Sequence, residues 1–148
     1  MDDMIKQAKL KALSLLNYMD RTESQLRKKL KEKSFDEQTI DEVVEYVKSF
    51  GYINDVGYAE RYVMNRQSAK SRQELYVALS QKGISKENIE HALGTCYESE
   101  NELSTIYCLL EKKHFIAEEA TEADKRRMYN YLLRKGFHRE DVCKALNV

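Results

Sequence analysis

The same order of apolar and polar positions occurs three times along the chain. The three copies start at Leu26, Leu75 and Met128, and no gap is needed to align them. Each copy has two apolar residues four positions apart, a spacing that places both side chains on one face of a helix. After a turn, each copy has three more apolar residues at positions i, i+3 and i+4, which is typical of a second amphipathic helix. The pattern therefore predicts a pair of amphipathic helices in each copy.

The predicted turn between the paired helices contains glycine in two of the three copies. Gly83 and Gly136 stand where the first helix of the pair should end, at a position that favours a left-handed backbone. Ile84 and Phe137 follow the glycines and can fold back onto the last helical turn. Ser34 takes the glycine position in the first copy, so we expect this turn to be somewhat strained or of a different type.

Polar residues mark the starts of the predicted helices. Thr22–Gln25 and Ser71–Glu74 fit the capping box, in which Ser or Thr precedes Gln or Glu by three positions. Asp36 and Ser85 are predicted N-caps of the helices that follow the turns. A further amphipathic helix is predicted before each copy, over residues 5–19, 58–66 and 103–110. The repeating unit is therefore three helices.

Composition favours an all-α fold. The chain has 148 residues with no Pro and 5 Gly, whereas the helix formers Lys, Glu, Leu and Ala are plentiful. A unit of about fifty residues buries little apolar surface by itself, so we expect neighbouring repeats to extend one another's core. We predict three tandem three-helix repeats, stacked into an elongated, curved molecule. Their ranges are residues 1–50, 51–96 and 97–148, the last with an acidic connection from Glu98 to Asp124.

The residue types used in catalysis and metal binding occur without the required spacing. His91, His114 and His138 are scattered and form no HExxH motif. The chain also has no GxSxG motif, no Walker phosphate loop and no glycine-rich dinucleotide turn. The three cysteines have no CxxC spacing, which argues against a zinc site and against a disulfide framework. We therefore expect no enzyme activity, no cofactor and no metal.

The sequence also predicts the compartment. No apolar run has the length of a membrane span, and the N-terminal MDDMIKQAKL lacks the apolar core of a signal peptide. An odd number of cysteines, without a disulfide pattern, suits a reducing environment. We therefore predict a cytoplasmic protein with no membrane partner.

Charge is distributed in zones along a chain whose net charge is zero. The zones have net charges of +4 over residues 1–33, −5 over 34–65, +2 over 66–96, −6 over 97–124 and +5 over 125–148. A domain that serves only to bind DNA phosphates is usually much more basic. Zoned charge instead suits a partner surface with its own charge pattern, or a basic stripe beside acidic ones.

Basic residues on and beside the middle helices of the repeats are the candidate binding residues. If these helices align in the stack, their side chains form one stripe that faces a protein filament or phosphates. For any one residue, a solvated position on a charged helix is an equally good interpretation. The candidates are Arg27, Lys28, Lys31, Arg66, Lys70, Arg72, Lys82, Arg126, Arg127, Arg134, Lys135 and Arg139, and they are densest after residue 124.

Two other groups of residues have open interpretations. Tyr52, Tyr58 and Tyr62 could stack on a base or on an aromatic ring of a partner, although tyrosines at helical spacing more often pack against a core. Asp55 beside Asn54 could contact a partner, whereas capping of a helix is the more common role.

Three longer runs together resemble the RecX family of RecA regulators. They are ALSLLNYMDRTESQLRKKL from Ala12, FGYINDVGYAERYV from Phe50 and ELYVALSQKGISKENIEHAL from Glu74. The most specific piece is GYIND, followed after two residues by Tyr-Ala. The resemblance extends from about Ala8 to Leu146, in the order that the family has.

The resemblance implies tandem three-helix repeats and also a function. Members of this family bind in the helical groove of RecA–DNA filaments, across neighbouring protomers, and inhibit ATP hydrolysis and strand exchange. The basic candidates would then contact RecA or DNA, and direct DNA binding would be weak. An autonomous DNA-binding module of stacked helices and a helical scaffold for another partner are the alternatives. We expect a monomer, because stacked repeats cap themselves at the ends.

Overall fold

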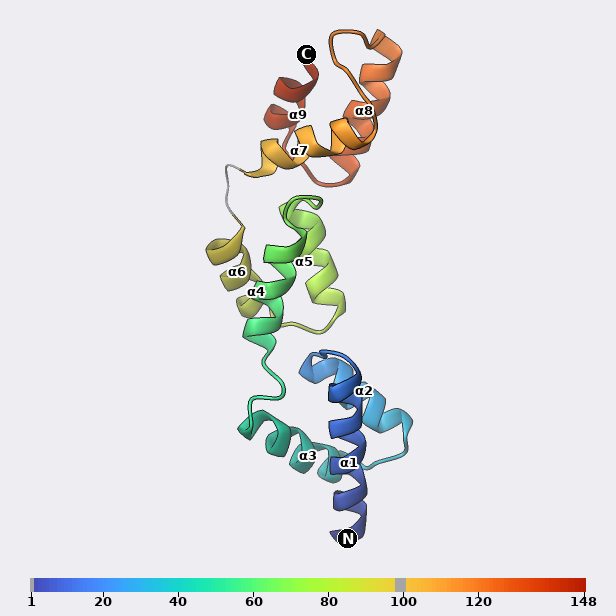
Figure 1. The fold of residues 1–148 in the computed structure, drawn as a ribbon, viewed down its shortest axis with the longest axis vertical. Coiled ribbons are helices and arrows are strands. Elements are labelled where there is room, and N and C mark those ends of the chain that lie inside the picture. The colour runs from blue at the N-terminus through green and yellow to red at the C-terminus, as the bar shows by residue number, and fades with distance from the viewer. Residues whose placement is uncertain (1, 98–100) are drawn as a thin grey trace.

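The structure is a computed structural model that describes residues 2–97 and 101–148, so the start of the acidic connection lies outside the described residues. Within these ranges the chain forms helices and no strands, which confirms the all-α prediction. The helices are α1 (Asp2–Tyr18), α2 (Glu23–Glu32), α3 (Glu37–Ser49), α4 (Asp55–Arg66), α5 (Arg72–Gln81), α6 (Lys86–Cys96), α7 (Asn101–Lys112), α8 (Glu122–Arg134) and α9 (Arg139–Leu146). Figure 1 shows three successive groups of three along an elongated molecule. Among these helices, none combines the length and the apolar character that crossing a membrane requires.

Side-chain caps start the helices where the sequence predicts. The Thr22 hydroxyl accepts from the Gln25 N–H at 3.2 Å, and the Gln25 side chain accepts from the Thr22 N–H at 3.0 Å. Ser71 and Glu74 form the same reciprocal pair at 3.1 and 3.0 Å. Both predicted capping boxes are thus confirmed, and they satisfy backbone donors that a helix N-terminus leaves free. The predicted N-cap hydrogen bonds of the third helices are also present, at Asp36 and Ser85.

All three middle helices end in the same left-handed turn. The φ angles are +83° at Gly83, +94° at Gly136 and +71° at Ser34. In each turn the next residue donates its N–H back to the helix, as Ile84 does to the Leu79 carbonyl at 3.1 Å. Ser34 therefore adopts the common turn in a strained form, and not a different turn type. A side chain in this conformation costs about 1 kcal/mol.

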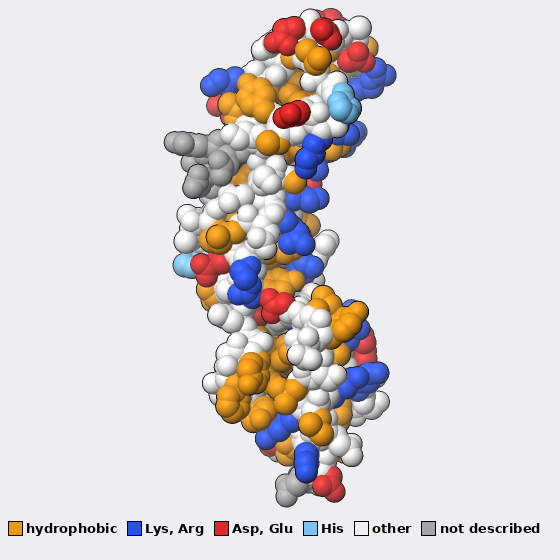
Figure 2. All heavy atoms as spheres, viewed as in Figure 1, with side chains coloured by type: hydrophobic (Ala, Val, Ile, Leu, Met, Phe, Trp, Pro, Cys, Tyr) orange, Lys and Arg blue, Asp and Glu red, His pale blue; other side chains and the backbone are white. Residues whose placement is uncertain are grey.

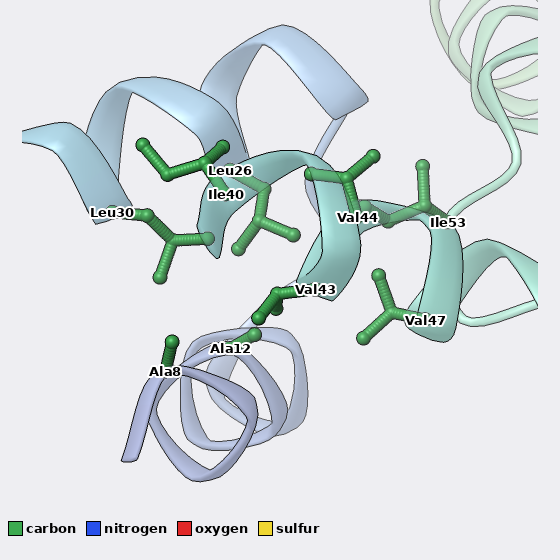
Figure 3. Close-up of a cluster of buried hydrophobic side chains, with 9 residues drawn as sticks. All are labelled: Ala8, Ala12, Leu26, Leu30, Ile40, Val43, Val44, Val47 and Ile53. Atoms are coloured by element: carbon green, nitrogen blue, oxygen red, sulfur yellow. The ribbon is translucent and has the colours of Figure 1, made fainter. Parts of the chain in front are cut away.

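Each repeat has a hydrophobic core of its own. Figure 3 shows the first core, where Ala8 and Ala12 of α1 face Val43 of α3, while Leu26 and Leu30 of α2 close the other side. The second core draws on α4–α6 and the third on α7–α9, with the turns between them. The prediction that neighbouring repeats extend a common core is therefore wrong. The reason is that the repeats meet at helix ends, whose backbone groups need polar partners.

The repeats meet at a joint that occurs twice in the same form. In the first joint the Thr22 hydroxyl donates to the Lys82 carbonyl, at the C-terminus of α5, at 2.7 Å. In the second joint the Ser71 hydroxyl donates to the Lys135 carbonyl, at the C-terminus of α8. Thr22 and Ser71 are both 0% exposed, so these hydrogen bonds are shielded from water. The N-cap of one middle helix thus binds the C-cap carbonyl of the next.

Glycine allows the two helix ends to approach at each joint. A Cβ added to Gly83 would overlap Ser24, the second residue of α2. A Cβ added to Gly136 would lie 2.6 Å from Oε1 of Gln73, the second residue of α5. Packing therefore requires glycine at both positions, in addition to the backbone angle. The equivalent Ser34 is exposed, so its side chain has room.

The joints align α2, α5 and α8 head to tail along one side of the molecule (Figure 1). The partly positive N-terminus of one helix meets the partly negative C-terminus of another, which is the favourable arrangement of helix dipoles. Side chains strengthen both joints. Asp55 Oδ1 accepts from the Glu23 N–H at 2.9 Å in the first, and Lys135 Nζ lies 2.9 Å from Glu74 Oε2 in the second. Asp55 therefore caps a helix of the preceding repeat.

Replacing Gly83 by Ala tests the packing at the first joint, with Gly51→Ala as the matched control. Gly51 also has a positive φ, of +73°, but a Cβ there meets nothing within 4 Å. We expect Gly51→Ala to lower the free energy of unfolding by about 1 kcal/mol, from backbone strain alone. Gly83→Ala should lower it by about 2–4 kcal/mol, because Ser24 must also move. Urea unfolding measures both losses, and equal losses would show that the joint does not need this glycine.

A buried carboxylate near the second joint gives the stability a pH dependence. Glu102 of α7 is 5% exposed, and no group in the described part of the chain donates to its Oε1. Burial raises the pKa of Glu102, and the charge of His138, whose Nε2 lies 3.8 Å from Oε2, opposes this rise. A carboxyl with a raised pKa in the folded state stabilises the fold at low pH. That contribution is lost as the pH rises above the unfolded value of 4.5 and through the folded pKa.

We therefore expect Glu102→Gln to raise the free energy of unfolding at pH 7 by about 1 kcal/mol, because no charge then needs burial. The gain should shrink at pH 4, where the carboxyl of the unmodified protein holds its proton. Urea unfolding at the two pH values measures the difference. A gain of the same size at both would mean that the charge of Glu102 is not its cause.

Candidate functional site

The second joint forms a cleft between the middle and third repeats. Its volume is about 340 Å³, and its floor is the outer face of α5. We call it the cationic cleft, because three of the candidate binding residues lie on it. Its lining residues are Tyr62, Lys70, Gln73, Glu74, Leu75, Val77, Ala78, Gln81, Arg134 and Lys135.

Three elements bring the cations to the cationic cleft. Lys70 lies in the turn after α4, where its N–H donates to the Arg66 carbonyl at 3.0 Å. Arg134 is the last residue of α8, and Lys135 is its C-cap. The Ser71 hydroxyl binds the Lys135 carbonyl, so the hydrogen bond that joins the repeats also places Arg134 and Lys135 against α5.

The ring of Tyr62 gathers two more of the candidate cations. The guanidinium carbon of Arg66 lies 4.1 Å from the ring centroid, and Lys82 Nζ lies 5.6 Å from it. Cation–π contacts of this kind contribute about 0.5–1 kcal/mol each at exposed sites. Tyr58 stacks on Tyr62 with 6.4 Å between the centroids, and both pack against the second core. Of the two roles considered, the structure shows core packing for Tyr58 and Tyr62, whereas Tyr52 is 51% exposed and stacks on the exposed Phe50.

Most of the positive charge at the cationic cleft is not neutralised within the protein. Across residues 2–97 and 101–148, no ion pair is formed by Arg66, Lys70, Lys82 or Arg134. Lys135 differs, because it pairs with Glu74 while its side chain is only 17% exposed. The cleft therefore has two lining cations without an ion pair, Lys70 and Arg134, and the ring of Tyr62 holds Arg66 and Lys82 beside them.

The space-filling view shows how local this charge is. Lys and Arg side chains form a column along the middle repeat and its junction with the third, whereas acidic side chains are prominent at the far end of the third repeat (Figure 2). A chain of zero net charge thus presents a positive strip on this face. Such a strip attracts anionic groups locally, with little long-range steering.

Among the remaining candidates, Arg27 and Arg72 are partly buried against partners in the protein, while Lys31 and Arg127 form exposed ion pairs with Glu37 and Asp124. Arg27 Nη1 lies 2.7 Å from Asp41 Oδ1, and its Nε lies 3.0 Å from Glu23 Oε2. Hydrogen bonds to the Asp41 and Glu23 carboxylates raise the pKa of Arg27. Arg72 is half-buried, with its guanidinium carbon 5.3 Å from the ring centroid of Tyr97. These contacts stabilise the first repeat and the second joint.

The other candidates lie away from the cationic cleft. Arg126 precedes Arg134 by two helical turns, which is about 12 Å along the helix axis. The cluster predicted after residue 124 is therefore divided between the two ends of α8. A binding role for any of the twelve candidates stays a prediction. The exposed candidates away from the cleft are Lys28 and Lys31 on α2, Arg126 and Arg127 on α8, and Arg139 on α9.

The floor of the cationic cleft was not among the sequence candidates. Three residues of the floor share one face of α5, because they lie four positions apart: Gln73, Val77 and Gln81. The buried Leu75 and Leu79 lie on another face of the helix. Val77 is 46% exposed. The sequence does contain a signal for this floor, namely an apolar residue between two glutamines on a helix surface that faces solvent.

Three family models match the chain in succession. They are the first three-helix domain of RecX at residues 8–46, the second at 54–93 and the third at 100–146. This chain belongs to the RecX family. The three RecX domains correspond to the three groups of helices in the structure, which confirms the resemblance seen in the sequence.

RecX relatives match over nearly the whole chain. Regulatory protein RecX of Caldanaerobacter subterraneus subsp. tengcongensis is 38% identical over 144 residues, which are 97% of this chain and 71% of that protein. Regulatory protein RecX of Clostridium perfringens (strain SM101 / Type A) is 35% identical over 149 residues, 98% of this chain and 68% of that protein. The crystal structure of RecX from Lactobacillus salivarius superposes with a TM-score of 0.85 at 26% identity, over 99% of this chain and 97% of the other. The chain is therefore a regulatory protein with the RecX fold.

Ser71→Ala tests the hydrogen bond that assembles the cleft, with Thr121→Ala as the matched control. Both hydroxyls cap a middle helix at 3.1 Å, but Ser71 also donates to Lys135, whereas Thr121 is exposed. We expect Thr121→Ala to lower the free energy of unfolding by about 1 kcal/mol, through the lost cap. Ser71→Ala should lower it by about 2–3 kcal/mol, because a buried carbonyl also loses its donor. Urea unfolding that gives equal losses would exclude a contribution from the joint.

Proposed function

We propose that this protein binds in the groove of the RecA–DNA filament and inhibits the ATP hydrolysis and strand exchange of RecA. The match of the RecX domains along the chain carries this proposal. Relatives named Regulatory protein RecX support the regulatory role. The protein would thereby modulate DNA repair, recombination and the SOS response in the cytoplasm.

The shape of the molecule supports binding along a filament. Three separately cored repeats follow one another along the long axis (Figure 1). An elongated molecule can contact several neighbouring protomers of a helical polymer at once. Once one repeat has bound, the others are held close to the polymer, so their contacts form at a high effective concentration. In this proposal the protein acts as a monomer and by binding alone, without catalysis of its own.

The charge distribution supports an anionic binding partner. Two unpaired cations, Lys70 and Arg134, line the cationic cleft, and the column of Lys and Arg side chains continues along the middle repeat (Figure 2). Both acidic protein surfaces and DNA phosphates in a filament groove present the complementary charge. The cleft residues Lys70 and Arg134 are therefore the first to test as filament contacts.

Direct binding of DNA is the second candidate function, and the same unpaired cations favour it. It predicts that the protein alone binds DNA with an affinity that falls steeply as salt rises. The net charge of zero opposes tight binding. We therefore place this function second.

The ATPase activity of RecA on single-stranded DNA, titrated with this protein, tests the proposed function. We expect inhibition, and we expect Lys70→Glu/Arg134→Glu to inhibit with a potency lower by about tenfold or more. Lys6→Glu/Lys112→Glu makes the same change in net charge at exposed lysines outside the twelve candidates and should keep its potency. Circular dichroism of both variants verifies that they stay helical.

The possible results have distinct meanings. No inhibition by the unmodified protein, even in excess over RecA, would contradict the proposed function. Equal potency of the two double variants would leave the function in place but move the contact away from the cationic cleft.

A further inference from the structure

The cationic cleft combines charge at its edge with an uncharged floor. Val77, 46% exposed, and Ala78 form the apolar part of the floor. Gln73 and Gln81 flank them with amide groups that both donate and accept hydrogen bonds. A ligand that fits this cleft carries negative groups around an apolar centre.

We infer that the cationic cleft binds an acidic protein segment, with carboxylates at Lys70 and Arg134 and an apolar side chain against Val77. The inference rests on the proposed function for its partner, because the segment would belong to the filament protein. It goes further by naming the chemistry that this cleft recognises. Arg134 suits such a ligand, because a guanidinium binds a carboxylate through two parallel hydrogen bonds.

The carboxylate of Glu74 at the cleft does not oppose an acidic ligand. Its Oε1 accepts from the Ser71 N–H at 3.0 Å, and its Oε2 lies 2.9 Å from Lys135 Nζ. Both oxygens are thus engaged at the joint, and Lys135 compensates the charge. Lys70 and Arg134 remain for the ligand.

The aromatic rings at the cleft are poorly placed for nucleic acid. Proteins that bind single strands offer aromatic faces on which bases stack. The ring of Tyr62 already carries Arg66 and Lys82. The neighbouring Tyr131 carries Lys113, with Nζ 4.4 Å from the ring centroid. Cations of the protein therefore occupy the positions that bases would need.

The extent of the charge also favours a protein segment. Nucleic acid gains affinity by neutralising many phosphates along a strand. Only two unpaired cations line the cleft, Lys70 and Arg134, and residues 97–124 have a net charge of −6. A short acidic segment brings several carboxylates to one place, which matches this compact arrangement.

Fluorescence anisotropy with two probes tests the inference. One probe is a labelled peptide of Glu and Asp residues with a single central Leu, and the other is a labelled oligothymidylate of equal charge. We expect the protein to bind the peptide more tightly than the oligothymidylate. Lys70→Glu/Arg134→Glu should weaken peptide binding by about tenfold or more. Lys6→Glu/Lys112→Glu, which changes the net charge equally at exposed lysines outside the twelve candidates, should leave it unchanged.

Two further comparisons address the floor and the folding of the variants. Val77→Ser should weaken binding of the Leu peptide. It should not weaken binding of the same peptide with a central Gly, because that peptide has no apolar side chain to contact Val77. Lys70→Gln/Arg134→Gln should bind the peptide with an affinity between those of the unmodified protein and the Glu variant, because it removes the two positive charges without reversing them. Circular dichroism checks each variant for helix content.

Three results would overturn the inference. In the first, the protein binds the oligothymidylate more tightly than the peptide, and the cleft variant loses that binding. In the second, the folded protein does not bind the peptide. In the third, the two Glu double variants lose equal amounts of peptide affinity. Inhibition of the RecA ATPase, measured on the same samples, separates these results from failure of the proposed function. If the unmodified protein inhibits the RecA ATPase in that case, only the acidic-segment inference is wrong.

Discussion

The hydrogen bond from an N-cap hydroxyl to the C-cap carbonyl of the next middle helix is the contact on which this structure depends. Thr22 and Ser71 each donate one, and Gly83 and Gly136 make room for it. Both hydroxyls are buried, so the carbonyls would have no ready substitute from water. A buried carbonyl left without a donor costs about 1–3 kcal/mol. Because the contact recurs, it sets the same relation between successive repeats.

In many repeat proteins a shared hydrophobic core connects neighbouring repeats, whereas here these joints connect them. Each hydrophobic core closes within three helices, so apolar burial stabilises the repeats one by one. The arrangement of the repeats is left to directional polar contacts between helix ends. The result is an elongated molecule, which suits the proposed binding along a filament (Figure 1).

The same joint also builds the cationic cleft. Arg134 and Lys135 reach α5 because Ser71 binds the carbonyl of Lys135. Tyr62 then gathers Arg66 and Lys82 through contacts with its ring. Three of the twelve basic candidates thus line the cleft, and two more contact the ring of Tyr62, which lines it too. The contact that aligns the repeats therefore also places the charges of the proposed binding site.

The sequence by itself determined the helices, their caps and their turns, because each depends on residues within about five positions of one another. Thr22–Gln25, Ser71–Glu74 and the turn at Gly83 formed as predicted for this reason. It also determined the family, through runs whose order spans the chain. Only the tertiary structure decided that the cores are separate and that Arg134 lies at a cleft while Arg126 does not. Those outcomes depend on which helix end meets which neighbour, and such pairs lie far apart along the chain.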